Sequence, residues 1–169
     1  MTDQLSDTRM KTFYDRTVQD FMDKRTWDLP FVEKSADIDH VFSILSGNDH
    51  LWVVEDTTSM KVVGVITEHD ALSLLSPASA SSHTFGRPNL RSLQYGLAST
   101  AEEIMTKKPI TISCQDRIVD VLTKMKQYQI RRLPVVDEKY TLIGEITLHH
   151  LIYQYHKEHG MISKQENTQ

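Results

Sequence analysis

The sequence predicts a mixed α/β fold, of the α+β type, built from two copies of one small unit, and an internal repeat carries this prediction. Residues 62–70 align with residues 142–150, displaced by 80 positions. Just upstream, residues 51–56 align with residues 133–138, displaced by 82 positions. The difference of two residues falls in a polar turn, where a change of length is tolerated. The repeat therefore divides the 169 residues into two small copies that are expected to behave as one folding unit.

The second copy shows the order of elements most clearly. The spacing of Thr100 and Glu103 is that of a capping box, which predicts the start of a short helix. Apolar residues recur at three- and four-residue spacing after Asp116 and predict an amphipathic helix. The elements expected are a short helix at 100–105, a strand at 109–112, a helix from 116, strands at 133–136 and 142–147, and a closing helix at 149–159.

The first copy repeats this order. Its expected elements are a short helix at 17–22, a strand at 31–32, a helix at 37–45, strands around Val53 and Val63, and a helix at 71–75. Each copy thus follows the order β-α-β-β-α after a short helix, and we expect the copies to pack sheet to sheet with pseudo-twofold symmetry. The predicted boundaries are a flexible tail at 1–11, a first repeat at 12–75, a linker at 76–99, a second repeat at 100–159 and a flexible tail at 160–169.

Composition and charge exclude several classes of protein. The chain has 19 Lys and Arg against 23 Asp and Glu, which gives a formal charge of −4. It therefore has no overall positive charge that would attract the phosphate backbone of a nucleic acid. Its single cysteine, Cys114, excludes an intrachain disulfide and a zinc ribbon. No run of residues is apolar enough to span a membrane, and the first ten residues have no secretory pattern. We expect a cytoplasmic protein without nucleic-acid or membrane partners.

Three segments, each weak alone, occur here in a fixed order. They are residues 100–105 followed by 109–112, residues 130–137 (IRRLPVVD), and residues 64–70 (GVITEHD). Together they resemble a tandem pair of cystathionine-β-synthase (CBS) domains, the Bateman module, over about residues 17–159. The resemblance implies a regulatory module that binds AMP, ADP, ATP or S-adenosylmethionine in the cleft between the repeats. It also implies a homodimer that signals to a separate effector protein, with no catalytic cofactor.

Thr67 and Asp70 are the residues on which physical chemistry supports this role most directly. Thr67 ends a strand and opens a helix, where free N–H groups and the helix dipole favour an anionic oxygen. The carboxylate of Asp70 can accept from both hydroxyls of a ribose, which is the role that the resemblance implies for it. The other contacts implied by the resemblance are Val65, Pro109, Ile110 and Ile130 for adenine, and Arg132 and Arg131 for phosphate.

A different interpretation of Thr67 and Asp70 is a capping box that only fastens the helix. The two interpretations are compatible, because a capping threonine still exposes backbone N–H groups.

The other possible site, which draws on both copies, departs from this pattern and is predicted to be weaker. Its counterparts of the binding residues are Pro30, Thr147 and His150. Glu145 takes the place of Val65, while Asp49 and His50 of the first copy stand where Arg131 and Arg132 stand in the second copy. Because two carboxylates would repel phosphate, we expect this site to be empty or to take a less anionic ligand.

Catalysis and metal binding have little support in the sequence. Three consecutive side chains such as Glu68, His69 and Asp70 point about 100° apart on a helix, so they do not converge on one ion. The sequence contains no nucleophile elbow, phosphate loop or zinc-protease motif. We expect no enzymatic activity and no metal. A structural or dimerising module without ligand, and a small nucleotide hydrolase or transferase, remain as alternatives.

Overall fold

The computed structural model describes residues 12–22, 28–75 and 98–160, and the chain divides into two compact units. Unit 2 is one continuous stretch, Asp28–Pro109. Unit 1 combines Met1–Trp27 with Ile110–Gln169. The expected tails, apart from Gly160, and the linker at 76–97 lie outside the described residues.

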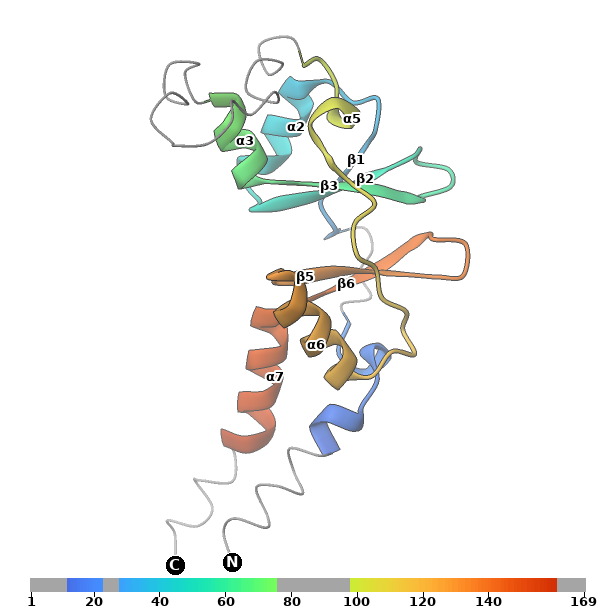
Figure 1. Ribbon diagram of the computed structural model, residues 1–169, viewed down its shortest axis with the longest axis vertical. Helices are drawn as coiled ribbons and strands as arrows, with labels where there is room; N and C mark the ends of the chain where they lie inside the picture. Colours follow the sequence, from blue (N-terminus) through green and yellow to red (C-terminus); the bar gives the residue numbers. More distant parts are fainter. Residues whose placement is uncertain (1–11, 23–27, 76–97, 161–169) are drawn as a thin grey trace, which may run out of the picture. The chain divides into compact units, whose positions relative to one another are not determined.

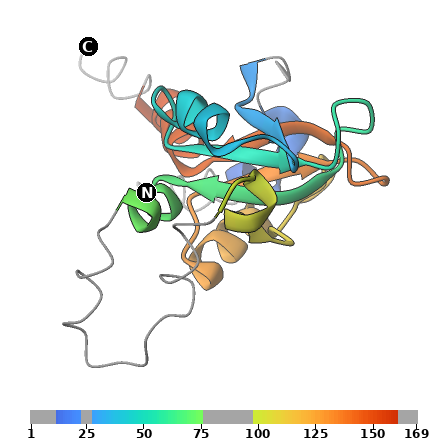
Figure 2. The same cartoon turned by 90° about the horizontal axis from the view of Figure 1, so that it is seen from above.

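Unit 2 contains a four-stranded sheet with its helices gathered on one face (Figure 1). Its elements are β1 (Phe31–Glu33), α2 (Ile38–Leu45), β2 (His50–Val54), β3 (Val62–Thr67), α3 (Glu68–Leu75), α5 (Ala101–Ile104) and β4 (Thr106–Lys107). The strands lie in the order β1-β2-β3-β4, with β1 parallel to β2 and the other pairs antiparallel. The hairpin β2–β3 forms the middle of this sheet (Figure 2).

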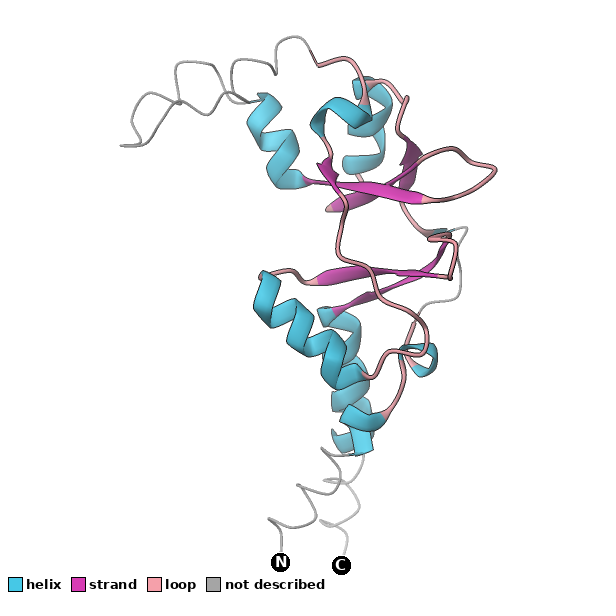
Figure 3. Ribbon diagram, turned by 45° about the vertical axis from the view of Figure 1, so that its right-hand side comes forward, coloured by secondary structure: helices cyan, strands magenta, loops and turns pink. Residues whose placement is uncertain are grey.

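Unit 1 repeats this plan on a smaller sheet. Its elements are the 3₁₀ helix η1 (Val18–Asp20), α6 (Ile118–Tyr128), β5 (Arg132–Val136), β6 (Leu142–Thr147) and α7 (Leu148–Gly160). Strands β5 and β6 form an antiparallel hairpin, and Ile112 adds a parallel bridge to Val135. Helices α6 and α7 lie on one side of this hairpin (Figure 3).

The two hairpins are equivalent down to their irregularities. In β3 and β6 alternate residues are buried, since one face of each strand packs on helices. His50 is the Cα partner of Thr67, as Arg132 is of Thr147. Both hairpins shift register at the same place, before Val54 and before Val136. The repeat seen in the sequence is therefore a repeat of backbone geometry.

Each unit contains the leading segment that the sequence assigns to the other repeat. Residues 12–22 belong to unit 1, and residues 98–107 belong to unit 2. In unit 1 the N–H of Val18 donates to Asp116 O at 2.9 Å, and the N–H of Ile118 donates to Arg16 O at 2.9 Å. In unit 2 the same two bonds recur from Ala101 to Ala36 at 2.8 Å and from Ile38 to Ser99 at 3.2 Å. The segment 12–22 therefore packs with residues 110–160, and the segment 98–107 packs with residues 28–75.

The hydrophobic cores reflect this exchange. The core of unit 1 takes Phe13, Val18 and Phe21 from the leading segment. Its other buried members are Ile112, Ile118, Val121, Met125, Leu133, Val135, Ile146 and Leu151. The core of unit 2 consists of Val32, Val41, Leu51, Val53, Ile66, Ala101, Ile104 and Met105.

The structure confirms the mixed α/β class and the order of elements, and it differs from the expectation around residues 104–112. Helix α5 ends at Ile104, and the next residues form β4, an edge strand that the sequence did not indicate. The expected strand at 109–112 is reduced to the single bridge at Ile112. The physical reason lies at Lys108, whose positive φ of 54° turns the chain, and at Pro109, which lacks an N–H for a ladder.

Candidate functional site

The candidate site in unit 2 is the junction between β3 and α3. The Oδ2 atom of Asp70 accepts from the backbone N–H of Thr67 at 2.9 Å and from its Oγ1 hydroxyl at 2.9 Å. These bonds form one half of a capping box, in which the side chain at the third helical position accepts from the backbone N–H of Thr67. Both bonds use Oδ2, so Oδ1 keeps its lone pairs for a further donor such as a ribose hydroxyl.

Neighbouring strands place further side chains beside this junction. His50 is the Cα partner of Thr67 across the hairpin, and Trp52 is the partner of Val65. On the other side of β3, Thr106 of β4 is also a partner of Val65. Directly paired residues share a face of a sheet, so these side chains lie on the face that carries Val65 and Thr67. Trp52 and Thr106 belong to no motif in the sequence, because their proximity to Val65 follows from strand pairing.

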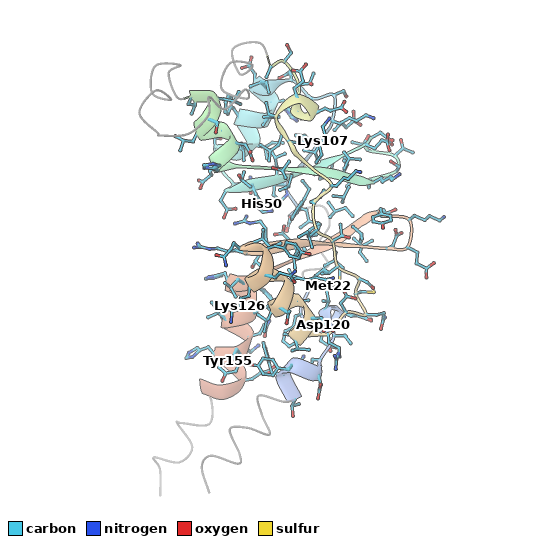
Figure 4. All side chains as sticks on the ribbon, viewed as in Figure 1. Met22, His50, Lys107, Asp120, Lys126 and Tyr155 are labelled. Carbon is cyan, nitrogen blue, oxygen red and sulfur yellow. The ribbon has the colours of Figure 1, made fainter. Side chains whose placement is uncertain are left out.

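His50 and Asp49 interact within unit 2. The Nδ1 atom of His50 lies 2.9 Å from Oδ1 of Asp49, and its ring packs edge-to-face on Trp52 with centroids 5.2 Å apart. The side chain is buried, and Figure 4 marks its place on β2. The Asp49 carboxylate, which the sequence suggested as a repulsive charge, is therefore engaged by an imidazole.

The equivalent junction of unit 1 has the opposite hydrogen-bond polarity. There the backbone N–H of His150 donates to Oγ1 of Thr147 at 3.1 Å, so the threonine is the acceptor. The side-chain amide of Gln154 lies 3.1 Å from Nε2 of His150 and orients the ring. The first turn of α7 carries no acidic residue, whereas the first turn of α3 carries Glu68 and Asp70.

The predicted residues are divided between the two units. Unit 2 brings together Val65, Thr67 and Asp70, and it also holds Pro30, Asp49, His50 and Pro109. Unit 1 holds Ile110, Ile130, Arg131, Arg132, Glu145, Thr147 and His150. Within unit 1 the carbonyl of Arg131 accepts from the N–H of Leu148 at 2.7 Å, and Arg132 is the Cα partner of Thr147. Ile110 and Ile130 pack against the core of unit 1.

A hollow of about 670 Å³ lies elsewhere in unit 1, between the segment 111–116 and the turn that joins β5 to β6. Its lining includes Cys114, Lys139 and Tyr140, and it includes none of the residues predicted to bind a ligand.

The residues that the structure describes contain neither a metal-binding cluster nor a helix that could span a membrane. In 12–22, 28–75 and 98–160, no three or more His, Cys, Asp or Glu residues are grouped so that they could hold a metal ion. Over the same ranges, no helix has the length and apolar character needed to cross a bilayer.

Comparison with known proteins gives the family and the fold. The family described as "CBS domain" matches residues 18–77 and 101–157. Among solved structures, CBSX2 in complex with AMP is 26% identical, with a TM-score of 0.66, covering 83% of this chain and 96% of that one. A second structure, of CBSX2 from Arabidopsis thaliana, has a TM-score of 0.63 at 25% identity, with 83% and 94% covered. The CBS domain pair of protein MJ0100, in complex with 5-methylthioadenosine and S-adenosyl-L-methionine, has a TM-score of 0.60 at 27% identity, with 85% and 98% covered.

Curated relatives match over a small part of their own length. Homoserine O-acetyltransferase of Methanosphaera stadtmanae is 30% identical over 142 residues, which are 83% of this chain and 24% of that protein. An arabinose 5-phosphate isomerase of Francisella tularensis is 42% identical over 50 residues, which are 30% of this chain and 15% of that protein. The chain thus spans less than a quarter of the length of either relative.

Proposed function

We propose a function from the premise that the chain belongs to the CBS domain family: it is a regulatory module that binds an adenosine-containing ligand. The ligand class is AMP, ADP, ATP or S-adenosylmethionine. The observation that carries the proposal is the β3–α3 junction, where Asp70 keeps one carboxylate oxygen for a hydroxyl and the N-terminus of α3 offers N–H groups to an anionic oxygen.

The solved relatives support the same class of ligand. A protein 26% identical to this chain is in complex with AMP, and one 27% identical is in complex with methylthioadenosine and S-adenosylmethionine. The further contacts implied by the sequence, Ile110 and Ile130 with adenine and Arg131 and Arg132 with phosphate, are part of this proposal. The site around Thr147 and His150 is proposed to be the weaker one.

The wider role is also a proposal. The module is expected to be cytoplasmic, to form a homodimer and to signal to a separate effector protein, without enzymatic activity of its own. The acetyltransferase and the isomerase match this chain over only 24% and 15% of their own lengths, so their activities are not part of this proposal. The competing proposal is a structural or dimerising module without ligand.

Calorimetric titration of the protein with AMP, ADP, ATP and S-adenosylmethionine, with and without Mg²⁺, tests the proposal. We expect heat from at least one ligand and a rise in melting temperature by mass action. The informative variant is Asp70→Asn, because the amide oxygen still accepts from Thr67 and preserves the cap, while the charge and the second acceptor are lost. Its matched control is Glu68→Gln, which removes an exposed charge from the same helical turn.

Asp70→Asn is expected to weaken binding by about 10- to 100-fold, since hydrogen bonds to a charged group contribute roughly 1.5–3 kcal/mol. Glu68→Gln is expected to leave affinity within about twofold. Absence of heat from all four ligands, with the protein folded by circular dichroism, would favour the module without ligand.

A further inference from the structure

We propose that the hollow of unit 1 binds a small organic cation, an aliphatic diamine or polyamine whose ammonium group meets the carboxylate of Asp137. The hollow has a volume of about 670 Å³ and lies between the segment 111–116 and the turn that joins β5 to β6. In Figure 1 this turn is the orange loop at the right-hand end of the hairpin. The inference goes beyond the proposed function, since none of the residues proposed to contact the adenosine ligand lines this hollow.

Lys34 of unit 2 and Cys114 of unit 1 occupy the same position in the repeated fold. Each lies two residues after a residue that pairs in parallel with the first strand of the hairpin. Their carbonyls also accept equivalent hydrogen bonds, from the N–H of Glu102 at 2.9 Å and from the N–H of Gln19 at 3.0 Å. The two side chains can therefore be compared directly.

Glu55 and Asp137 likewise occupy the same position, at the start of each hairpin turn. The N–H of Glu55 donates to Lys61 O at 2.8 Å, and the N–H of Asp137 donates to Thr141 O at 3.1 Å. Each unit thus has a carboxylate at the base of its hairpin turn, facing the segment that carries Lys34 or Cys114.

In unit 2 two side chains cross from this segment to the turn. The Nζ atom of Lys34 lies 3.0 Å from Oε1 of Glu55, and Oε1 of Glu33 accepts from the N–H of Thr57 at 2.8 Å. The hydrogen bond to Glu55 raises the pKa of Lys34, which keeps this side chain a cation. An ammonium group therefore fills the space beside the turn carboxylate in unit 2.

In unit 1 the side chains at these positions are too short to reach the turn. Cys114 replaces Lys34, and Ser113 replaces Glu33. The Oγ atom of Ser113 accepts from the N–H of Gln115 at 3.2 Å, and the side-chain amide of Gln115 lies 3.8 Å from Sγ of Cys114. Both side chains interact within their own segment, and the hollow lies where unit 2 has its lysine bridge.

The apolar part of the lining suits a ligand with an aliphatic body. It consists of Ile112, Val136 and Ile143, against which methylene groups can be buried. Tyr140 adds an aromatic ring that is 56% exposed, and an ammonium group is attracted to the face of such a ring. The volume lies within the range of about 300–1,000 Å³ that is typical of small-molecule pockets.

The charged part of the lining favours a cation over an anion. Asp116, Asp137 and Glu138 contribute carboxylates, and Lys139 contributes the opposite charge. Lys124 pairs with Asp116 at 3.2 Å, so Asp137 and Glu138 together still outweigh Lys139. A backbone N–H of the turn lowers the pKa of Asp137, which keeps its carboxylate charged at neutral pH.

Calorimetric titration with putrescine and spermidine tests this inference, with butanediol as the uncharged counterpart of putrescine. Cys114→Lys places an ammonium group where unit 2 has Lys34, and its matched control, Cys114→Ser, keeps the side chain short. Glu138→Gln removes an exposed charge from the lining. Its control is Asp120→Asn, which removes an exposed charge of α6 outside the lining (Figure 4).

We expect about one amine to bind per chain and butanediol to give no heat. Cys114→Lys should lower the affinity at least tenfold, since its own ammonium group competes for Asp137, while Cys114→Ser should stay within about twofold of the parent. Glu138→Gln should weaken binding by about two- to fivefold, and Asp120→Asn should not. The exchange of Glu33→Ser with Lys34→Cys gives unit 2 the residues of unit 1 and should add a second binding event.

Absence of heat from both amines with the protein folded by circular dichroism would overturn the inference. Equal affinities of Cys114→Lys and Cys114→Ser, or an unchanged stoichiometry after the exchange in unit 2, would also overturn it. Equal losses in Glu138→Gln and Asp120→Asn would show general attraction of amines to an acidic surface, and this pair decides the matter if Cys114→Lys does not fold. Each of these outcomes leaves the proposed function intact, because neither amine is a ligand proposed for the β3–α3 junction.

Discussion

In unit 2 the helix after the hairpin begins with a carboxylate that accepts two bonds from Thr67, whereas in unit 1 the equivalent helix begins with Thr147 accepting one bond from His150. The backbone around both junctions is the same, with equivalent registers and bulges. The same backbone geometry therefore carries a different side-chain hydrogen-bond pattern in each unit.

The units also differ in how the chain builds them. Unit 2 is one continuous stretch, whereas unit 1 is assembled from two segments separated by the whole of unit 2. In unit 1 the leading segment is held to α7 by an edge-to-face contact of Phe13 with Tyr155, centroids 5.4 Å apart, and by an ion pair of Arg16 with Glu158. Figure 4 marks Tyr155 on α7.

The largest effect is expected from Phe13→Ala. This side chain is 4% exposed in the core of unit 1, and truncating a buried phenylalanine costs about 3–5 kcal/mol. Hydrogen exchange should show lost protection in β5, β6 and α6, with β2 and β3 retaining theirs. The matched variant Ile104→Ala, in the core of unit 2, should show the reverse pattern. Lost protection in unit 2 after Phe13→Ala would contradict the assignment of the leading segment to unit 1.

An exchange of residues tests whether side chains explain the difference between the junctions. Glu145→Val with His150→Asp gives unit 1 the residues of unit 2 at the positions of Val65 and Asp70. We expect a second AMP to bind per chain, or a weak second event to tighten by about 10- to 100-fold, since charge-assisted hydrogen bonds are worth roughly 1.5–3 kcal/mol. Calorimetric stoichiometry checks this, and the reverse exchange, Val65→Glu with Asp70→His, should remove the first event. An unchanged stoichiometry would show that these two positions do not decide occupancy.

Gly64→Ala tests the packing of β4 on β3. Because the added Cβ would meet Met105 Sδ at 2.3 Å, the methionine must move, and overpacking of this kind costs about 1–3 kcal/mol. Chemical denaturation measures the loss. Gly47→Ala is the control, since nothing lies within 4 Å of its Cβ and a change within about 0.5 kcal/mol is expected. Gly64→Ala with Met105→Ala should cost less than the sum of the two single variants, and strict additivity would contradict the contact.

The smallest effect is a pH dependence shared by the hairpin turns. The pKa of Asp56 is lowered, mainly by the backbone N–H of Ser59 at 2.7 Å, and the pKa of Asp137 is lowered, mainly by the backbone N–H of Thr141 at 2.9 Å. Both folded-state pKa values lie below those of the unfolded chain. At a pH between the folded-state and unfolded-state pKa values, the unfolded chain therefore binds more protons than the folded chain. This contribution to stability is present above about pH 4 and is lost as pH falls through the folded pKa values.

Melting temperatures of the parent chain and of Asp56→Asn with Asp137→Asn, measured from pH 6 to pH 2, test this dependence. The double variant should show a shallower decline in acid. An identical decline would mean that the two turns make no contribution.

Much of this fold could be predicted from the sequence because the periodicity of apolar residues sets the faces of the helices and strands. The hairpins, α2, α6 and the capping box of Thr100 with Glu103 follow from local patterns. The capping pair of Thr67 with Asp70 could be found in the same way. Trp52 and Thr106 could not be placed beside Val65, since register is a property of paired strands.

The exchange of leading segments could not be predicted for a related reason. The spacing of Thr17 to Asp20 and of Thr100 to Glu103 indicates that a helix begins, but not which core it joins. That choice depends on long-range contacts, such as those of Val18 with Asp116 and of Ala101 with Ala36. The boundary between the compact units accordingly lies between Pro109 and Ile110, after the segment that these contacts hold in unit 2.

The divided construction of unit 1 also sets an order of events during synthesis. Unit 2 is complete once Pro109 has been added, whereas Phe13, Val18 and Phe21 must wait for the strands and helices that follow residue 110. At about 5–20 residues per second, the ribosome needs roughly 2–10 s to extend the chain from Pro109 to the end of α7. During that interval unit 2 is complete, but the apolar side chains of residues 12–22 lack the rest of the unit 1 core against which they pack. A nascent chain of this protein therefore has a defined period in which a chaperone or a wrong partner can compete for residues 12–22.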